Sequence, residues 1–534
     1  MTLTSVSFAV FVFVALIVYY AVPLKYRWIA LLAASMAFYG IVCFKYMPYI
    51  LVTTVSTFFG AKVIERIQTK SKAYIKEHKK EWTKEQKSEY KAKVTTKKKL
   101  VLAATLVFNF GILAVVKYCD FFVDTFVAVL KIFHVTIESP HLGFVLPLGI
   151  SFYTFQAMGY IIDVYRQKVK AQTNLFKFAL FVSFFPQIVQ GPIGIYDKLA
   201  DQLYEGHKID YDNLKFGFQL VLWGLAKKLI IADRAVCLIN YVCNDAYSFS
   251  GAWILTAALF YSIQLYTDFS GGIDISRGVA RMFGIEMAIN FNRPYFSKTI
   301  SEYWRRWHIT LGAWLKDYLF YPIAMSSAFL KLGRKSKEHL GKHVGKILPA
   351  SIATFITFIV IGVWHGANWK YVAFGAWNGL IIFLSNMLEP TFASINEKLK
   401  INTEKLYFRL FRMFRTFLIV LVGYYFDIAN NFSEAMMMMW RSVTDVNPAD
   451  LIDRGIKDAI GLHIRDYLII IFGSIFLLFV SLYQEKKNCI IRYKIAQCKA
   501  PVRWFVMIAS VMAIILLGMY GPGTSASEFV YMQF

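Results

Sequence analysis

Several familiar catalytic signatures are missing from this chain of 534 residues. It has no GxSxG nucleophile elbow, no Walker-type phosphate loop and no GxGxxG turn, so serine-hydrolase and nucleotide-driven functions lack support. Its six cysteines form neither CxxC pairs nor a regular ladder, which argues against a disulfide framework or a zinc module. No internal repeat is visible, and many transporter folds are built from repeats. These absences disfavour soluble hydrolases, metal-folded domains and repeat-built transporters.

Apolar residues, in contrast, are abundant. The chain is 57% hydrophobic and 17% aromatic, with a mean hydropathy of +0.47, more than a soluble protein could cover. Many runs reach the roughly 20 residues that cross about 30 Å of hydrocarbon. The sequence predicts an all-α, polytopic transmembrane helical protein with about 10–13 membrane segments around a central channel, some of them interfacial or re-entrant. The candidate runs are 5–22, 27–45, 47–64, 100–118, 142–162, 174–194, 215–233, 251–267, 348–364, 371–388, 407–426, 466–483 and 503–520.

The net charge of +25 is concentrated in two loops. Residues 66–99 carry 13 Lys or Arg against 4 Glu, and residues 293–346 carry 11 against 3 acids. The positive-inside rule places such loops in the cytoplasm. We therefore expect 66–99 to be a basic cytoplasmic loop, either a charged helix pair or disordered, and the N-terminus to lie outside a cell membrane. The first run lacks a positive n-region and a cleavage site, so it is not read as a cleavable signal. Nucleic acid is not an expected partner.

Polar residues and glycines interrupt an apolar run at 266–281, which contains DFSGGIDISRG. Irregular backbone at membrane depth persists only where it is buried in protein or lines a wet cavity. We therefore expect this segment to form part of a cavity wall. Outside Asp268 and Asp274 the candidate spans are nearly free of acids, whereas transporters often carry paired intramembrane acids.

A histidine stands between two apolar runs in the segment IGVWHGANW, residues 361–369. A charged side chain at the bilayer centre costs about 2.5–3.5 kcal/mol on insertion scales. A neutral imidazole escapes part of that cost but still needs a polar partner. Gly362 and Gly366 allow close backbone approach beside His365, and Asn368 is the candidate polar partner. His365 is therefore either a reacting group or a structural hydrogen-bonding group between helices.

A second histidine, His308, lies in an aromatic-rich segment, residues 297–321. Thr299 and Glu302 can form a capping box, and the apolar residues that follow have helical spacing. His308 would then lie on or near the apolar face of an amphipathic helix. One interpretation is an interfacial helix with His308 as a satisfied core residue. The other is a site for an anionic, phosphate-bearing donor, since Arg305 and Arg306 can pair with phosphate.

The other histidines carry weaker signals. His339 and His343 have the i, i+4 spacing of metal ligands, but their loop is rich in lysine and lacks a carboxylate or thiol cluster. We expect no metal site in this chain.

Two stretches together carry a family resemblance. The segment DFSGGIDISRGVARMFGIEMAINFNRPYFSKTISEYWRRWHITLGAWLKDYLFYPI, residues 268–323, is followed by VWHGANW at 363–369. These motifs closely resemble the membrane-bound O-acyltransferase (MBOAT) family, in its bacterial cell-surface branch of alginate and peptidoglycan O-acetylases and teichoic-acid D-alanyl transferases. The likeness extends through PLGISFYTFQAMGYIIDVYR (147–166) and FVSFFPQIVQGPI (181–193) to the closing EFVYMQF (528–534).

The resemblance implies one integral-membrane acyltransferase domain over 1–534, with its catalytic core segment at 266–369. It implies that His365 is the general base and that His308 is a second essential histidine, which positions or polarises the donor. No tightly bound cofactor is implied; acetyl-CoA or a phosphopantetheine-carrier thioester would be the donor. Expected partners are the lipid bilayer, an envelope polysaccharide and an extracytoplasmic acyl-accepting protein. The residues expected to bind substrate or donor are Arg305, Arg306, Trp304, Trp307, Asp268, Ser270, Asn292, Trp364 and Asn368.

Two departures from the family pattern concern the acceptor. Gly272 and Ile273 replace the family's tyrosine and serine after DFSG, and YYFDIANNFSEAM (424–436) stands where the O-acetylases often have an aromatic-rich run. O-acetylation of an envelope polysaccharide is the leading interpretation. D-alanylation of teichoic acid is the alternative within the enzyme class, and a transporter with a histidine proton relay is the alternative outside it.

Overall fold

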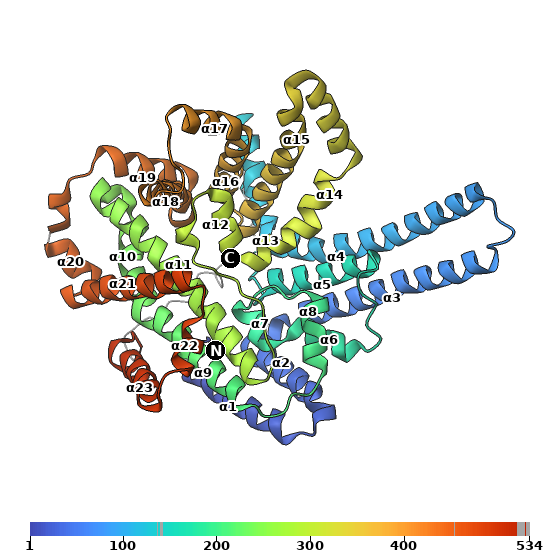
Figure 1. The fold of residues 1–534 in the computed structure, drawn as a ribbon, viewed down its shortest axis with the longest axis horizontal. Helices are drawn as coiled ribbons and strands as arrows, with labels where there is room; N and C mark the ends of the chain where they lie inside the picture. Colours follow the sequence, from blue (N-terminus) through green and yellow to red (C-terminus); the bar gives the residue numbers. More distant parts are fainter. Residues whose placement is uncertain (136, 139–142, 453, 521–528, 530–534) are drawn as a thin grey trace. The chain divides into compact units, whose positions relative to one another are not determined.

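The computed structural model describes residues 1–534 except 136, 139–142, 453, 521–528 and 530–534 (Figure 1). The described residues form helices and no strand, which confirms the predicted all-α class. Packing divides the chain into two units. One consists of Met1–Phe218 with Ser276–Ala288, and the other of Gln219–Ile275 with Ile289–Phe534. The single acyltransferase domain over 1–534 stays a prediction.

The first unit contains the N-terminal helices. Its core is rich in aromatic side chains such as Phe38, Phe178 and Phe181, all fully buried. Two long helices, α9 (Tyr211–Leu225) and α11 (Gly251–Met282), contribute one end to this unit and the other end to the second. The other helices are α1 (Val6–Ala21), α2 (Arg27–Cys43), α3 (Met47–Glu77), α4 (Lys84–Ile132), α5 (Ile150–Tyr165), α6 (Leu175–Ser183), α7 (Phe185–Gln190) and α8 (Tyr196–Tyr204).

The basic loop 66–99 is a helical hairpin. It consists of the end of α3 and the beginning of α4, which run side by side (Figure 1). Thr83 and Gln86 form a capping box at the first turn of α4. The rings of Tyr74 and Trp82 pack at the tip, with their centroids 5.4 Å apart. Of the two forms expected for this loop, the charged helix pair is therefore correct.

The second unit holds the two histidines. Its α15 is broken at Gly341, where φ is +88°, and the segment after the break leads to His365. The other helices of this unit are α10 (Asp233–Asn244), α12 (Ile300–Arg306), α13 (Ile309–Leu315), α14 (Tyr321–Ala324), α15 (Ser327–His365), α16 (Trp369–Met387), α17 (Glu389–Lys398), α18 (Leu406–Ile428), α19 (Phe432–Thr444), α20 (Arg454–Ile460), α21 (Ile464–Lys487), α22 (Ile491–Ala496) and α23 (Ala500–Leu517).

The backbone of 266–281 is regular, because α11 runs through this segment without a break, and the expectation that the segment forms part of a cavity wall stays a prediction. Gly271 of this helix allows α9 to pack closely against it. A Cβ atom added to Gly224 of α9 would lie 2.5 Å from the carbonyl oxygen of Gly271, and one added to Gly271 would lie 2.9 Å from that of Gly224. The glycines thus let two helix backbones touch, a device that is common within membranes.

The apolar helices make this a multi-pass membrane protein. Within the described part of the chain, five helical segments can cross a bilayer by length and composition, or six if the bent pair α16–α17 forms one span. The five segments are Leu24–Glu77, Lys84–Ile132, Ser327–His365, Ile464–Lys487 and Ala500–Leu517. Residue 142 of the expected run 142–162 lies outside the described residues, and the helix within the rest of that run begins at Ile150. The run 174–194 divides into α6 and α7 at Phe184. The count of about 10–13 crossings stays a prediction.

Candidate active site

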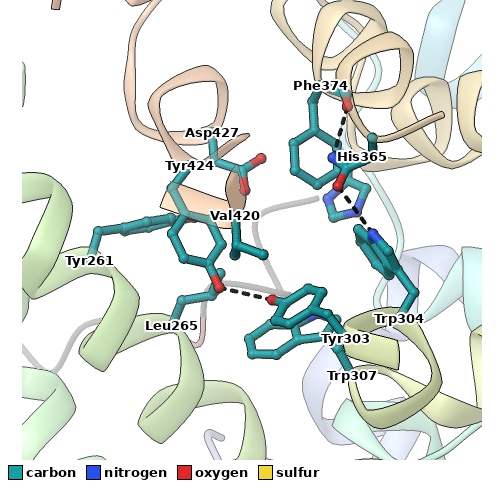
Figure 2. A pocket seen from close by; sticks show the side chains of 11 residues that line it. Tyr261, Leu265, Tyr303, Trp304, Trp307, His365, Phe374, Val420, Tyr424 and Asp427 are labelled. Atoms are coloured by element: carbon teal, nitrogen blue, oxygen red, sulfur yellow. Dashed lines mark hydrogen bonds between the residues drawn. The ribbon is translucent and has the colours of Figure 1, made fainter. Parts of the chain in front are cut away.

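A small cavity in the second unit lies beside His365 (Figure 2). It has about 20 Å³ of room for a water-sized group, enough for about one water molecule or one hydroxyl. Its wall is largely aromatic and comes from five helices. The lining residues are Tyr261 and Leu265 of α11, Tyr303 and Trp304 of α12, Trp307, His365 of α15, Phe374 and Asn378 of α16, and Val420, Tyr424 and Asp427 of α18.

His365 is the last residue of α15, and its side chain is buried among aromatic rings. Its ring centroid lies 5.1 Å from that of Phe374 and 6.2 Å from that of Tyr371, onto which it stacks. Gly366 is required by this stacking, because a Cβ atom there would lie 2.3 Å from Cε2 of Tyr371. The glycine after the histidine therefore makes room for the tyrosine beside the imidazole.

Asn368 has a structural role at the start of α16, and its expected contact with the imidazole or with substrate stays a prediction. Its side-chain Oδ1 caps the N-terminus of α16 and accepts a hydrogen bond from the backbone N–H of Lys370, at 3.0 Å. Asparagine is one of the preferred residues at this position because its side chain satisfies an orphan N–H of the first helical turn. Asn368 therefore fixes the start of α16, which carries Phe374 and Asn378 into the cavity wall.

The amphipathic helix expected over 297–321 is interrupted at His308. Helix α12 ends at Arg306, and His308 adopts the left-handed conformation, with φ +45° and ψ +52°, before α13 begins at Ile309. The cap predicted at the start is present in part: Oγ1 of Thr299 accepts from the N–H of Glu302 at 3.1 Å. The carboxylate of Glu302 turns instead to the N–H of Lys298.

Asn290 holds the turn at His308. Its Oδ1 lies 3.3 Å from Nδ1 of His308 and accepts from both the backbone N–H and the hydroxyl of Thr310, each at 2.9 Å. A backbone N–H can only donate, so the amide atom that faces it is the oxygen. Nδ1 of His308 must then carry a proton to bond with that oxygen. In the neutral ring Nε2 is consequently the acceptor.

Burial, and secondarily the nearby His365, lower the pKa of His308 to about 3. The ring is 1% exposed and packs edge-on against Phe269, with the centroids 4.9 Å apart. His308 is therefore neutral at physiological pH, since burial in an apolar environment disfavours the charged imidazole. Among the described side chains the cavity lining includes His365 and not His308.

Two of the three expected tryptophans, Trp304 and Trp307, line the cavity. The indole N–H of Trp304 donates to Oδ1 of Asn378 at 3.0 Å, which joins α12 to α16 (Figure 2). Trp307 stacks on Tyr303, with the centroids 5.6 Å apart and the planes at 17°. Trp364 packs against His365 but is not among the lining residues. Trp304 and Trp307 thus contribute two indole rings to the aromatic wall of the cavity.

The two arginines expected to bind the donor have different surroundings. Arg306 forms ion pairs with Glu302 at 2.9 Å and with Glu485 at 3.1 Å. The side chain of Arg305 is exposed to solvent. Neither lines the cavity. Arg305 is consequently the better placed of the two to meet a phosphate from solvent.

Asp268 and Ser270 belong to a buried polar cluster rather than to the cavity lining. Lys228 lies 2.6 Å from Oδ1 of Asp268 and 2.9 Å from Asp233, and Nζ of Lys227 donates to Oγ of Ser270 at 2.8 Å. Asn292 is exposed, and its backbone N–H donates to the carbonyl of Arg306. Among the described residues no group of three or more His, Cys, Asp or Glu could hold a metal ion.

Three residues that sequence reasoning did not single out take part in the site. Asn290 was passed over in favour of Asn292, two positions later. Tyr424 and Asp427 lie in the YYFDIANNF run, which is noted above only as a departure from the family pattern. An aspartate at the end of the apolar run 407–426 was a signal that could have been followed.

Comparison with known proteins places this site in a family context. Residues 67–426 match the sequence model of MBOAT, the membrane-bound O-acyltransferase family. A probable alginate O-acetylase AlgI of Azotobacter vinelandii is 34% identical over 363 residues, which cover 66% of this chain and 65% of that protein. The chain thus spans slightly less than two thirds of the length of that relative.

Two further relatives have different acceptors in their names. A peptidoglycan O-acetyltransferase of Helicobacter pylori is 32% identical over 378 residues, which cover 66% of this chain and 63% of that protein. A teichoic acid D-alanyltransferase of Bacillus subtilis is 29% identical over 283 residues, which cover 52% of this chain and 67% of that protein. The matched family segment contains both His308 and His365 and ends one residue before Asp427.

Proposed function

Because the chain belongs to the membrane-bound O-acyltransferase family, we propose that it transfers a short acyl group, in the first instance acetyl, from a thioester to a hydroxyl. The observation that carries this proposal is the position of His365, a buried imidazole at the edge of a small cavity inside a membrane protein.

The proposed reaction needs one base and no cofactor. The acceptor hydroxyl loses its proton to His365 as its oxygen attacks the thioester carbonyl carbon. The resulting tetrahedral intermediate collapses, the carbon–sulfur bond breaks, and the thiolate takes the proton back from the imidazolium. The products are an oxygen ester and a free thiol. A positioned base of this kind typically contributes about 10²–10⁴-fold to the rate.

The size of the cavity supports a small acyl group. With room for about one water-sized group next to His365, it suits the methyl end of acetyl and not a long alkyl chain. Because Nδ1 of His308 is bonded to Asn290, we infer that His308 acts as a neutral acceptor at Nε2. In this role His308 would accept a hydrogen bond from an N–H group of the acyl donor and so orient that molecule, rather than polarise its carbonyl.

We propose further that the donor, acetyl-CoA or a phosphopantetheine-carrier thioester, arrives from the cytoplasm of a cell whose membrane holds the protein with its N-terminus outside. Arg305 is the side chain best placed for the phosphates. The acceptor on the outer side is a hydroxyl of an envelope polysaccharide, reached directly or through an acyl-accepting partner protein. The names of the alginate and peptidoglycan O-acetylase relatives support a polysaccharide acceptor.

The test compares mild-base-labile esters on the cell envelope in cells with the wild-type protein and with His365→Ala. Loss of acetate in the variant supports O-acetylation, and loss of D-alanine supports the function named for the Bacillus subtilis relative. Equal ester content, with the variant folded and present at the wild-type level, rejects the enzymatic proposal. His339→Ala, which changes a histidine far from the cavity lining, is the matched control.

A further inference from the structure

One acidic side chain faces the cavity without belonging to the two-histidine core. Asp427 lies at the end of α18, and Figure 2 shows its carboxylate directed toward the side of the cavity that His365 lines. Among the described residues, no hydrogen-bond partner is found for its buried Oδ1 atom. Leaving a buried acceptor unsatisfied is unfavourable, so such an atom in a native protein calls for an explanation.

The nearest cation does not supply that explanation. Nζ of Lys370 donates to the backbone carbonyls of Asp427 and Ala429, the former at 3.0 Å, and so satisfies the last carbonyls of α18. Cations are favourable at a helix C-terminus for this reason. The ammonium group is therefore engaged by the main chain, while the carboxylate of Asp427 lines the cavity.

Three other polar side chains of the wall, those of Tyr303, Tyr424 and Asn378, have protein partners. The hydroxyls of Tyr303 and Tyr424 bond to each other at 2.9 Å (Figure 2), and that of Tyr424 also bonds to Tyr295 at 2.9 Å. The amide of Asn378 accepts from Trp304 and donates to the carbonyl of Phe374. Of these wall groups, Asp427 is the one with an oxygen available to a donor from a ligand.

A single hydroxyl cannot serve both His365 and Asp427, because it has one proton to donate and the base must receive it. The carboxylate is then open to a different donor of the ligand. Aromatic walls with a carboxylate suit a molecule that has apolar C–H faces and several hydroxyls, which is the chemistry of a carbohydrate or another polyol.

We propose that Asp427 accepts a hydrogen bond from a second hydroxyl of the acceptor, adjacent to the one that reacts, and thereby selects polyhydroxylated acceptors. This inference rests on the proposed acyltransferase function. It makes Asp427 a specificity-determining residue, and it places acceptor choice on α18, which follows the segment 266–369 that carries both histidines.

The experiment compares two acceptors that differ by one hydroxyl, propane-1,2-diol and propan-1-ol, with the purified full-length protein and acetyl-CoA. Ester formation and thiol release give kcat/KM for each alcohol. The wild type is expected to prefer the diol. Asp427→Asn and Asp427→Ala are expected to lower kcat/KM for the diol by about 10- to 100-fold, because a buried hydroxyl of the diol would lose its hydrogen-bond partner, and to leave the value for propan-1-ol within about twofold.

Asp445→Asn is the matched control, because it removes a carboxylate from an exposed pair with Arg441 on the neighbouring helix α19. An equal loss with both alcohols, a raised KM for acetyl-CoA, or no loss overturns the inference. A wild type that forms no diol ester also overturns it. Failure of the proposed function itself has a different signature, namely envelope esters that do not depend on His365.

Discussion

The imidazoles of His308 and His365 contact the same indole ring, that of Trp364, at centroid distances of 5.9 and 5.2 Å. The two histidines come from separate segments, one from a left-handed turn between short helices and the other from the end of α15. Only His365 is part of the cavity lining among the described side chains. The two histidines therefore have unequal positions: His365 lines the cavity, and His308 is held beside Asn290 outside the lining.

We predict that Asn290→Ala destabilises the protein, whereas Asn292→Ala does not. The first variant removes the acceptor of three hydrogen bonds at the His308 turn, and the second changes an exposed side chain. Loss of a buried partner costs about 1–3 kcal/mol. Thermal unfolding of the detergent-solubilised variants measures the difference. Equal midpoints for the two would show that Asn290 does not hold the turn.

We predict an acid sensitivity that depends on His308. The folded state holds the pKa of His308 at about 3, while an unfolded histidine titrates near 6.5. As the pH falls below about 6.5, His308 becomes protonated in the unfolded chain but stays neutral in the native state. The native state should therefore lose about 1.4 kcal/mol per pH unit from this group until the pH approaches its folded pKa. Unfolding midpoints between pH 7.5 and 5 should show a shallower slope for His308→Gln, and identical slopes would contradict this assignment.

We predict that Val420→Ala widens the range of acyl donors. Val420 lines the cavity and is 5% exposed, so its truncation adds volume next to His365. One methylene in an apolar pocket is worth about 1–3 kcal/mol of discrimination. The ratio of kcat/KM for propionyl-CoA to that for acetyl-CoA should rise by about tenfold or more. Leu418→Ala, at an exposed position on the same helix, is the control and should leave the ratio unchanged.

We predict that Lys228→Met is strongly destabilising. Lys228 is 1% exposed and pairs with both Asp268 and Asp233, so the substitution leaves two carboxylates buried without their cation. Breaking a buried pair costs about 3–5 kcal/mol. Lys93→Met removes the exposed pair with Glu89 on α4 and should not move the unfolding midpoint. A similar midpoint for both variants would mean that the buried cluster contributes little.

The sequence was sufficient for the helical class, the buried histidines and the tryptophan wall, because apolar periodicity and rare intramembrane histidines are local signals. It was not sufficient for the break at His308. Trp307 and Leu311 keep helical spacing across the break and are buried on both sides of it, so periodicity does not reveal the turn. The turn depends on Asn290, whose contact with His308 is a tertiary one.

The assignments of Asp268 and Ser270 illustrate a second limit. Both are polar residues in an apolar run, which suggests a ligand, but their partners are lysines about 40 residues earlier in the chain. Asn368 was similarly assigned to the imidazole, although a helix begins at the next residue and uses its side chain as a cap. The local sequence pattern identifies unusual polar residues, but only the folded structure shows which of them form hydrogen bonds or ion pairs with one another.

The glycines between α15 and α16 bring these helices into direct backbone contact. A Cβ atom on Gly362 would lie 2.2 Å from the carbonyl oxygen of Tyr371, and one on Gly375 would lie 2.3 Å from that of Phe358. Such close backbone packing opposes sliding or rotation of α15 against α16, so it holds His365 in one position. Transport of the two reactants to a stationary imidazole, rather than motion of that imidazole, would then set the pace of turnover.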